Sequence, residues 1–445
     1  TGSLLTSADV VATQLTATSN IGLGSTAVDS ITTGDYNVGV GANALTATTT
    51  GDENVAIGFR ALLTNTTGSD NCAYGSGALQ LATTADNNTA MGKDAAYANT
   101  TGTNNTAIGK SAMYTNTTGN NNTALGLNAL DANTTGSENY AGGFNALGAN
   151  TTASNNTAVG SRALLTNTTG AENTAVGRNA MYSNTTGANN TSLGRESLEA
   201  NTTASNNTAI GKAALKANTT GAANVAVGYR SLQANTTASS NTAVGTDSLV
   251  SNTTGTSNTA IGRDTLNQQT TASYNTAVGH QASNLNTTGD HITALGYGAL
   301  KANTTASNNT SVGSEALTAN TTGGQNTAIG TEALKDNTTG YSNVAVGRQA
   351  LTDNTTGFEN TAVGARALFT NTTGDHNVAV GRSALAVNTT ANANTALGYS
   401  SLLANTTGTE NTAAGEYTLR YNTTGDANVA VGRRALFNNT TADNN

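Results

Sequence analysis

A glycine that returns every seventeen residues constrains this chain more than any other feature of its sequence. It is first met at Gly24 and recurs through Gly160 and Gly177 to Gly432, twenty-five times without an insertion or deletion. A short period kept this strictly is typical of a solenoid, in which each repeat forms one coil that stacks on the next. We therefore expect one coil for every seventeen residues.

Numbering each coil from this glycine as position 0 separates its columns. Position −4 is nearly always Asn, −3 is mostly Thr or Val, −2 is small, and −1 is mostly Val, Ile or Leu. Position +4 is mostly Leu, +7 is mostly Asn, +8 and +9 are always Thr, and +10 is Gly or Ala. The alternation from −4 to 0 predicts a strand with positions −3 and −1 on one face and −2 on the other.

The −2 column suggests that this strand is covered on both faces. A face that met water would not stay Ala, Gly or Ser in every coil. We expect one face to line the coil interior and the other, carrying position −2, to meet a neighbouring chain. For positions +3 to +9 the alternatives are an extended or turn-like segment, which Thr-Thr favours, and a helical turn at Ala-Leu-x-x-Asn.

The remaining invariant columns predict how coils are joined. Asn at −4 and +7 should form side-chain ladders between coils, and Thr at +8 and +9 can contribute hydroxyls. Position +10 is constrained by size rather than by a positive φ, because Ala replaces Gly there. The residues that represent the expected ladder and core are Asn173, Thr174, Ala175, Val176, Gly177, Leu198, Asn201, Thr202 and Thr203.

The charged residues identify the solvent side. Within the repeats every Lys, Arg, Asp, Glu and His falls at +1, +2, +5, +6, +11 or +12, which leaves eleven columns to be buried, tightly packed or in turns. The formal net charge is −8, so there is no basic field for nucleic acid. No apolar run reaches the roughly 20 residues of a membrane span. A single cysteine, Cys72, excludes an intrachain disulfide and is expected in the core.

We expect two parts in the chain. Residues 1–19 lack the repeat and are interpreted as a cap or lead-in that covers the first coil. Residues 20–445 are expected to form an all-β parallel solenoid of about twenty-five coils. At about 4.8 Å per coil this predicts a rod of about 120 Å.

The run Thr-Thr-Gly-x-x-Asn-Thr-Ala-Val-Gly at 168–177 resembles the head repeats of YadA-like trimeric autotransporter adhesins. Their small-x-Gly-x-x-Ser-Val-Ala-Ile-Gly pattern has the same seven-residue step between glycines, although this chain has three more residues in the rest of its coil. It also resembles the Asn-Thr-Ala-x-Gly arrays of phage tail-fibre-like proteins. The resemblance covers residues 20–445 and implies a left-handed β-roll, three chains around one axis, and an adhesive or fibre role.

No arrangement of residues points to catalysis, a cofactor or a bound metal. The three histidines are expected on the surface without partners, and Gly109-Lys110-Ser111 lacks the earlier glycine of a phosphate loop. The Asn-Thr-Thr units and Asn-Asn-Thr at 155–157 are formal glycosylation sequons, which we interpret first as ladder and turn residues; a glycosylated rod is the alternative. We expect no enzyme activity, no nucleic-acid partner and no membrane insertion.

The leading hypothesis is a homotrimeric fibre shaft or adhesin, outside the cell or on a virion, that binds other copies of itself and a host-surface glycan or receptor. One alternative is an ice-binding solenoid. The adjacent Thr residues at +8 and +9 argue against it, because they would point to opposite sides of an extended segment and not form one flat face. Others are a single-chain filament subunit without an adhesive role, and a fibre-borne enzyme acting on carbohydrate, which would need clustered carboxylates.

Overall fold

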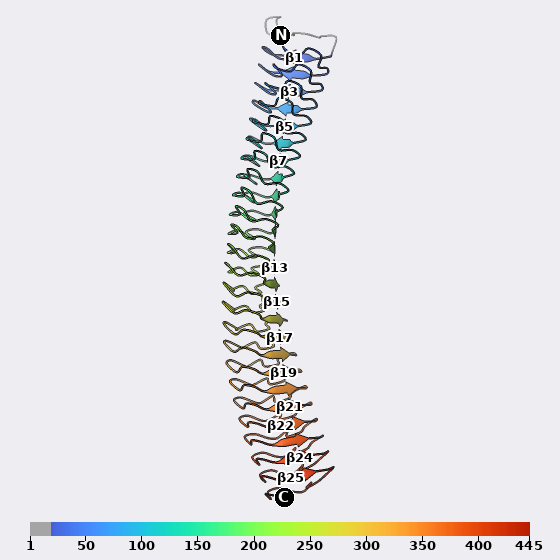
Figure 1. Ribbon diagram of the computed structural model, residues 1–445, viewed down its shortest axis with the longest axis vertical. Coiled ribbons are helices and arrows are strands. Elements are labelled where there is room, and N and C mark those ends of the chain that lie inside the picture. The colour runs from blue at the N-terminus through green and yellow to red at the C-terminus, as the bar shows by residue number, and fades with distance from the viewer. Residues whose placement is uncertain (1–18) are drawn as a thin grey trace, which may run out of the picture. The chain divides into compact units, whose positions relative to one another are not determined.

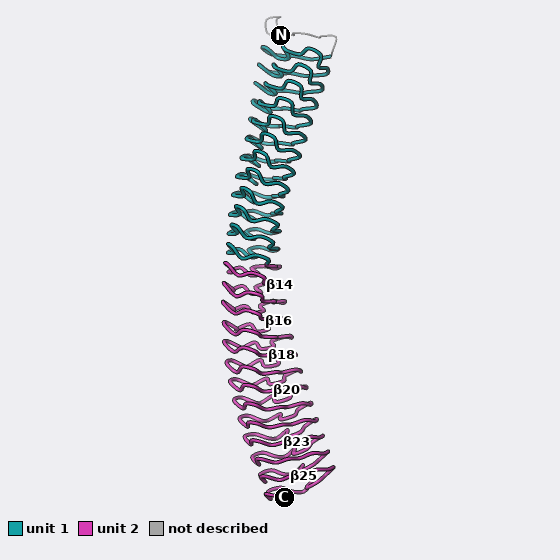
Figure 2. Tube along the Cα trace, viewed as in Figure 1, with its two compact units in different colours: residues 1–223 teal, residues 224–445 magenta. Residues whose placement is uncertain are grey.

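The computed structural model of the protein describes residues 19–445, so the expected lead-in lies, except for its last residue, outside the described part. The chain divides into two compact units, residues 1–223 and 224–445 (Figure 2). Each unit is a stack of seventeen-residue coils with one short strand per coil, and the described residues include no helix. This confirms the predicted all-β parallel solenoid.

The strands are three residues long and cover positions −3 to −1. Those of the first unit are β1 (Ile21–Leu23), β2 (Val38–Val40), β3 (Val55–Ile57), β4 (Cys72–Tyr74), β5 (Thr89–Met91), β6 (Thr106–Ile108), β7 (Thr123–Leu125), β8 (Tyr140–Gly142), β9 (Thr157–Val159), β10 (Thr174–Val176), β11 (Thr191–Leu193) and β12 (Thr208–Ile210). Those of the second are β13 (Val225–Val227), β14 (Thr242–Val244), β15 (Thr259–Ile261), β16 (Thr276–Val278), β17 (Thr293–Leu295), β18 (Thr310–Val312), β19 (Thr327–Ile329), β20 (Val344–Val346), β21 (Thr361–Val363), β22 (Val378–Val380), β23 (Thr395–Leu397), β24 (Thr412–Ala414) and β25 (Val429–Val431).

Within each unit, consecutive strands pair in parallel and in register, so each residue lies beside its equivalent in the next coil (Figure 1). In β9 and β10, for example, Thr157 lies opposite Thr174 and Val159 opposite Val176. The strand hydrogen bonds continue into the flanking residues, since the Thr157 amide donates to the Asn173 carbonyl oxygen at 2.8 Å. The unbroken seventeen-residue period is what this register requires.

The faces of the strand are the reverse of those that we predicted. Position −2 points into the coil and is fully buried, as at Ala175 and Ala243, whereas −3 and −1 point outward. In the coil of Gly194, the Ser192 hydroxyl at −2 donates to the carbonyl oxygen of Ser197 at +3, at 2.9 Å, which places the two columns across one interior. The −2 residues are therefore small because their own coil has little room, and not because another chain packs on them.

The interior of each coil is thin and half polar. Leu198 and its equivalents at +4 are the large buried side chains, and they pack with Ala at −2 and at +3. Val at −1, which we expected beside Leu in the core, is outside it. Because so little apolar surface is buried per coil, much of the remaining interior is filled by Asn side chains at −4 and +7.

Both predicted asparagine ladders are confirmed. At −4, the Asn173 side-chain amide donates to the Gly187 carbonyl oxygen at 2.8 Å. At +7, the Asn201 amide donates to Asn184 Oδ1 at 2.8 Å in the preceding coil and to the Ala204 carbonyl oxygen at 3.0 Å in its own coil. These bonds satisfy buried amides that an apolar core would leave without partners.

The segment from +3 to +9 consists of turns and bends, in agreement with the turn-like alternative rather than the helical one. Three non-glycine positions of the coil, +2, +4 and +12, are left-handed, as at Glu196, Leu198 and Asn206 with φ of 60°, 49° and 62°. This conformation costs roughly 1–2 kcal/mol for most residues. At +4 it turns the Leu198 amide toward the next coil, where it donates to the Ala214 carbonyl oxygen at 3.0 Å.

Position 0 requires glycine for a steric reason. Gly177 has φ of +133°, and a Cβ there would lie 2.6 Å from the carbonyl oxygen of Gly194 in the next coil. Position +10 differs, because glycines such as Gly187 have no positive φ and Ala204 occupies the same column, buried. The prediction that size restricts +10 is confirmed.

Candidate functional site

The outward side of the strands forms the surface that the fold itself leaves unexplained. We call it the strand face and define it as positions −3 and −1 of β1–β25. Its side chains are half-buried to exposed: Val159 at −1 is 38% exposed and Leu193 is 42% exposed, while Thr157 at −3 is half-buried. In each unit the strand face consists of two parallel columns: position −3, which is mostly Thr or Val, and position −1, which is mostly Val, Ile or Leu.

The strand face is uncharged in every coil, although it is in contact with solvent. The absence of charge at −3 and −1 led us to expect burial, and for these columns that expectation is wrong. Exposed apolar residues are normal when scattered, whereas a contiguous stripe of them is typical of an interaction surface. Cys72, predicted to be a core residue, is on this face and is only partly buried.

The predicted ladder and core residues therefore divide into three groups. Asn173, Ala175, Leu198 and Asn201 are fully buried, as expected, and Gly177 forms the turn after the strand. Thr174 and Val176 belong to the strand face. Thr202 and Thr203, which the sequence does not distinguish, have different environments: Thr202 is half-buried and Thr203 is exposed.

The two threonine columns differ in hydrogen bonding. At +8, the half-buried Thr202 hydroxyl donates to the Thr219 carbonyl oxygen of the next coil at 3.1 Å. At +9, Thr203 and its equivalents are exposed in every described coil, and no hydroxyl of this column has a hydrogen bond within the described residues. The hydroxyl ladder that we expected for both columns exists only at +8.

Burial decides which sequons a glycosylating enzyme could reach in the folded chain. The Asn of each Asn-Thr-Thr unit is at +7, and Asn201 donates both side-chain protons inside the coil. A glycan on that nitrogen is incompatible with the ladder. Asn155, at +12, is instead exposed in a left-handed turn. The ladder interpretation thus holds for +7.

Charged and aromatic side chains at the solvent columns pair with those of neighbouring coils. Lys216 Nζ lies 2.9 Å from Glu196 Oε2 and 3.2 Å from Glu199 Oε2, and Arg230 Nε lies 2.8 Å from Asp247 Oδ1. Hydrogen bonds from Lys216 and then Arg195 lower the pKa of Glu196 to about 2. These pairs satisfy the charges of the solvent columns locally.

The histidines were expected to be surface residues without partners, and the second part of that prediction is wrong. His291 stacks on Tyr274 with ring centroids 5.2 Å apart, and His280 stacks on Tyr297 at 5.7 Å. His376 Nε2 lies 3.1 Å from Glu359 Oε2. Residues one coil apart are neighbours in this fold, a proximity that the seventeen-residue spacing would have revealed.

Among residues 19–445 no three His, Cys, Asp or Glu side chains lie close enough to hold a metal ion, and no helix could cross a membrane. No protein-family model and no curated protein sequence matches this chain.

Proposed function

We propose that this chain is a fibrous protein whose strand face packs against other copies of itself, three around one axis, to form a fibre shaft or adhesin head. The supporting observation is that positions −3 and −1 stay uncharged and partly apolar in every coil while remaining outside the core. A left-handed winding, an extracellular, cell-surface or virion location, and attachment to a host-surface glycan or receptor belong to the same proposal.

The periodicity of the strand face favours another copy as its partner. Contact groups that recur once per coil, at about 4.8 Å, can be matched along many coils only by a surface with the same spacing. A second copy has that spacing, and burying the −1 side chains would remove apolar area from water at about 25 cal/mol per Å². The small −2 column does not support a trimer, because it lies inside the coil.

The assembly is tested by analytical ultracentrifugation of the parent chain and two triple variants. The parent is expected at about three times the chain mass of 44.2 kDa. Val227→Lys, Val244→Lys and Ile261→Lys together place three charges on the strand face and should dissociate the assembly. The matched control, Gln233→Lys, Val250→Lys and Asn267→Lys, places them at +5, where Lys216 occurs naturally, and should remain trimeric.

A monodisperse monomer of the parent would rule out the trimer and leave the single-chain filament. A trimer that survives the strand-face substitutions would show that the chains pack through another surface.

An ice-binding role is the second candidate, because ice is also a lattice of fixed spacing. The structure places a Thr column at −3 on the strand face beside the −1 column, so the hydroxyl–methyl array does not depend on the +8 and +9 threonines. Freezing-point depression at micromolar protein, reduced in the strand-face triple variant and unchanged in the +5 control, would support this role. If the parent chain causes no freezing-point depression, the ice-binding role is excluded.

A catalytic role is not part of the proposal. The supporting observation is that Glu196 and Asp247 form ion pairs with Lys216 and Arg230 of neighbouring coils. Incubation with surface glycans is expected to release no sugar; release would contradict this part of the proposal.

A further inference from the structure

One position in the first unit lacks the side chain that normally fills the outer surface of the coil. At +5, long side chains pack on their equivalents one coil away, as where Tyr97 stacks on Tyr114 with ring centroids 5.0 Å apart. Gly148 is the single glycine of this column in the sequence. Its coil lies between those that carry Asp131 and Leu165.

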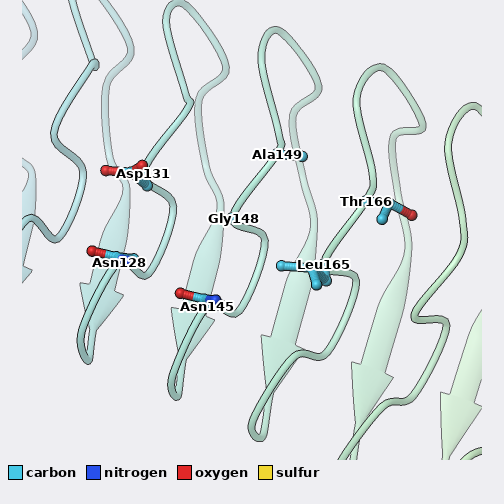
Figure 3. A pocket seen from close by; sticks show the side chains of 7 residues that line it. All are labelled: Asn128, Asp131, Asn145, Gly148, Ala149, Leu165 and Thr166. Atoms are coloured by element: carbon cyan, nitrogen blue, oxygen red, sulfur yellow. The ribbon is translucent and has the colours of Figure 1, made fainter.

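The missing side chain leaves a pocket of about 240 Å³ (Figure 3). Asp131 and Leu165 stand at +5 on either side of Gly148, and Asn128 and Asn145 at +2 line the same hollow. A Cβ on Gly148 would lie 3.1 Å from Leu165 Cδ1, so a larger side chain here would occupy the space. The volume is below the roughly 300–1,000 Å³ of pockets for drug-sized ligands, and suits one small molecule.

The polar groups that line the pocket are the Asp131 carboxylate and the side-chain amides of Asn128 and Asn145, while the Thr166 hydroxyl already donates to the Tyr182 and Asn184 carbonyl oxygens. Asn145 Oδ1 is buried and has no hydrogen bond within the described residues. The Asp131 carboxylate forms no ion pair there, and burial raises its pKa. Asn145 Oδ1 itself has almost no accessible surface, so the Asp131 carboxylate is the acceptor that a ligand can reach. A partly buried carboxylate without a donor is costly, so a molecule that supplies hydroxyl donors would be stabilised here. Leu165 adds an apolar wall.

We propose that this pocket binds a single neutral pyranose, with its hydroxyl groups donating to the Asp131 carboxylate and its C–H face on Leu165. A pyranose combines closely spaced hydroxyl donors with an apolar face, which is the combination that the lining offers. The biological role of this binding, attachment to a surface glycan, rests on the proposed adhesive function; the pocket and its lining do not depend on that function.

The probes are methyl glucoside, methyl galactoside and methyl mannoside, tested one at a time on the full chain by saturation-transfer NMR. At least one should bind with a Kd of about 1–10 mM, as expected for a ligand of this size in an open pocket. Gly148→Leu should weaken binding at least about tenfold, because Leu is natural at this column, as in Leu165, and fills the hollow. Asp131→Asn should also weaken binding, although it leaves the shape of the pocket unchanged.

Ala386→Leu is the matched control, since it makes a similar change at +5 in the second unit, away from the pocket. It should bind the glycoside like the parent, and melting curves would show that all variants are folded. Failure of all three glycosides to bind the parent, equal binding by Gly148→Leu, or binding of methylammonium in place of the glycosides would overturn the proposal. Sedimentation of the same samples reports the assembly separately, so each proposal can fail alone.

Discussion

The backbone amide of Asn173 donates to Asn156 Oδ1 of the preceding coil at 3.0 Å, while Asn173 Oδ1 accepts the amide of Asn190 in the next coil at 3.0 Å. One asparagine, through its backbone amide and its side-chain oxygen, thus connects three coils. The equivalent bond recurs along the −4 column, which makes this ladder a structural element comparable to the strands.

Replacing Asn173 by Ile should destabilise the neighbouring coils by about 1–3 kcal/mol, because the Asn190 backbone amide loses its buried acceptor and the Gly187 carbonyl oxygen loses one of its two donors. Ile is chosen because Ile292 occupies the same column, buried, in another coil. Amide hydrogen exchange at Asn190 should accelerate. Thr203→Val, at an exposed hydroxyl without a hydrogen bond, is the control and should change stability by less than about 0.5 kcal/mol; equal effects would contradict the role of the ladder.

The inward direction of position −2 can be tested with Ala243→Leu. The larger side chain enters an interior that is already filled, so the substitution should cost about 1–3 kcal/mol or more. The loss should appear in thermal melting even for a monomeric sample, because it concerns the chain's own coil. A variant that melts like the parent would show that −2 has free space beside it.

Leu232→Ala should cost about 2–5 kcal/mol, since it removes the one large apolar side chain that is buried in its coil. The measurement is denaturant unfolding, with local hydrogen exchange to show that the damage centres on that coil, as nearest-neighbour stability predicts. Exposed Leu193→Ala on β11 is the comparison: in the monomer it should cost clearly less, and a similar cost for both would contradict the assignment of the core.

The two glycine columns should respond differently to alanine. Gly177→Ala must adopt φ near +133° and approach the Gly194 backbone, so it should be strongly destabilising, by more than about 2 kcal/mol. Gly187→Ala keeps an ordinary φ and recreates the residue found at Ala204, although its Cβ would crowd the Ala204 carbonyl oxygen unless the turn shifts, so it should cost less than Gly177→Ala. Melting of the two variants side by side decides the point, and a larger loss for Gly187→Ala would reverse our interpretation of both columns.

The contribution of Glu196 should depend on pH in a defined direction. Its pKa falls from 4.5 to about 2 on folding, so its pairing stabilises the chain above pH 4.5 and is lost as the pH falls from 4.5 toward 2. The difference in melting temperature between the parent and Glu196→Gln should therefore be present at pH 7 and shrink at pH 2.5. For Glu138→Gln, a residue without an ion pair in the described structure, no such change is expected.

The sequence by itself determined the solenoid, the seventeen-residue coil, a strand within −4 to 0 and the asparagine ladders, and it favoured a turn-like segment over a helix at +3 to +9. These features can be read from the residue types at each position of the repeat. In a stack of coils each residue lies beside its equivalents in the two adjacent coils, so the residue types that recur at a position show which side chains fit there. Even the neighbours of the histidines could have been found, since adding seventeen to a residue number leads to the adjacent coil.

The tertiary structure decided which way the strand faces. Alternation separates Ala175 from Thr174 and Val176 but does not say which side is inside, and hydrophobicity favoured the wrong one. The deciding factor is the size of the interior: Met181 at +4 of the same coil, held in a left-handed conformation, already fills it, so only a small residue fits opposite and Val176 is left outside. The pocket beside Gly148 likewise depends on which side chains share a surface, which composition and period do not specify.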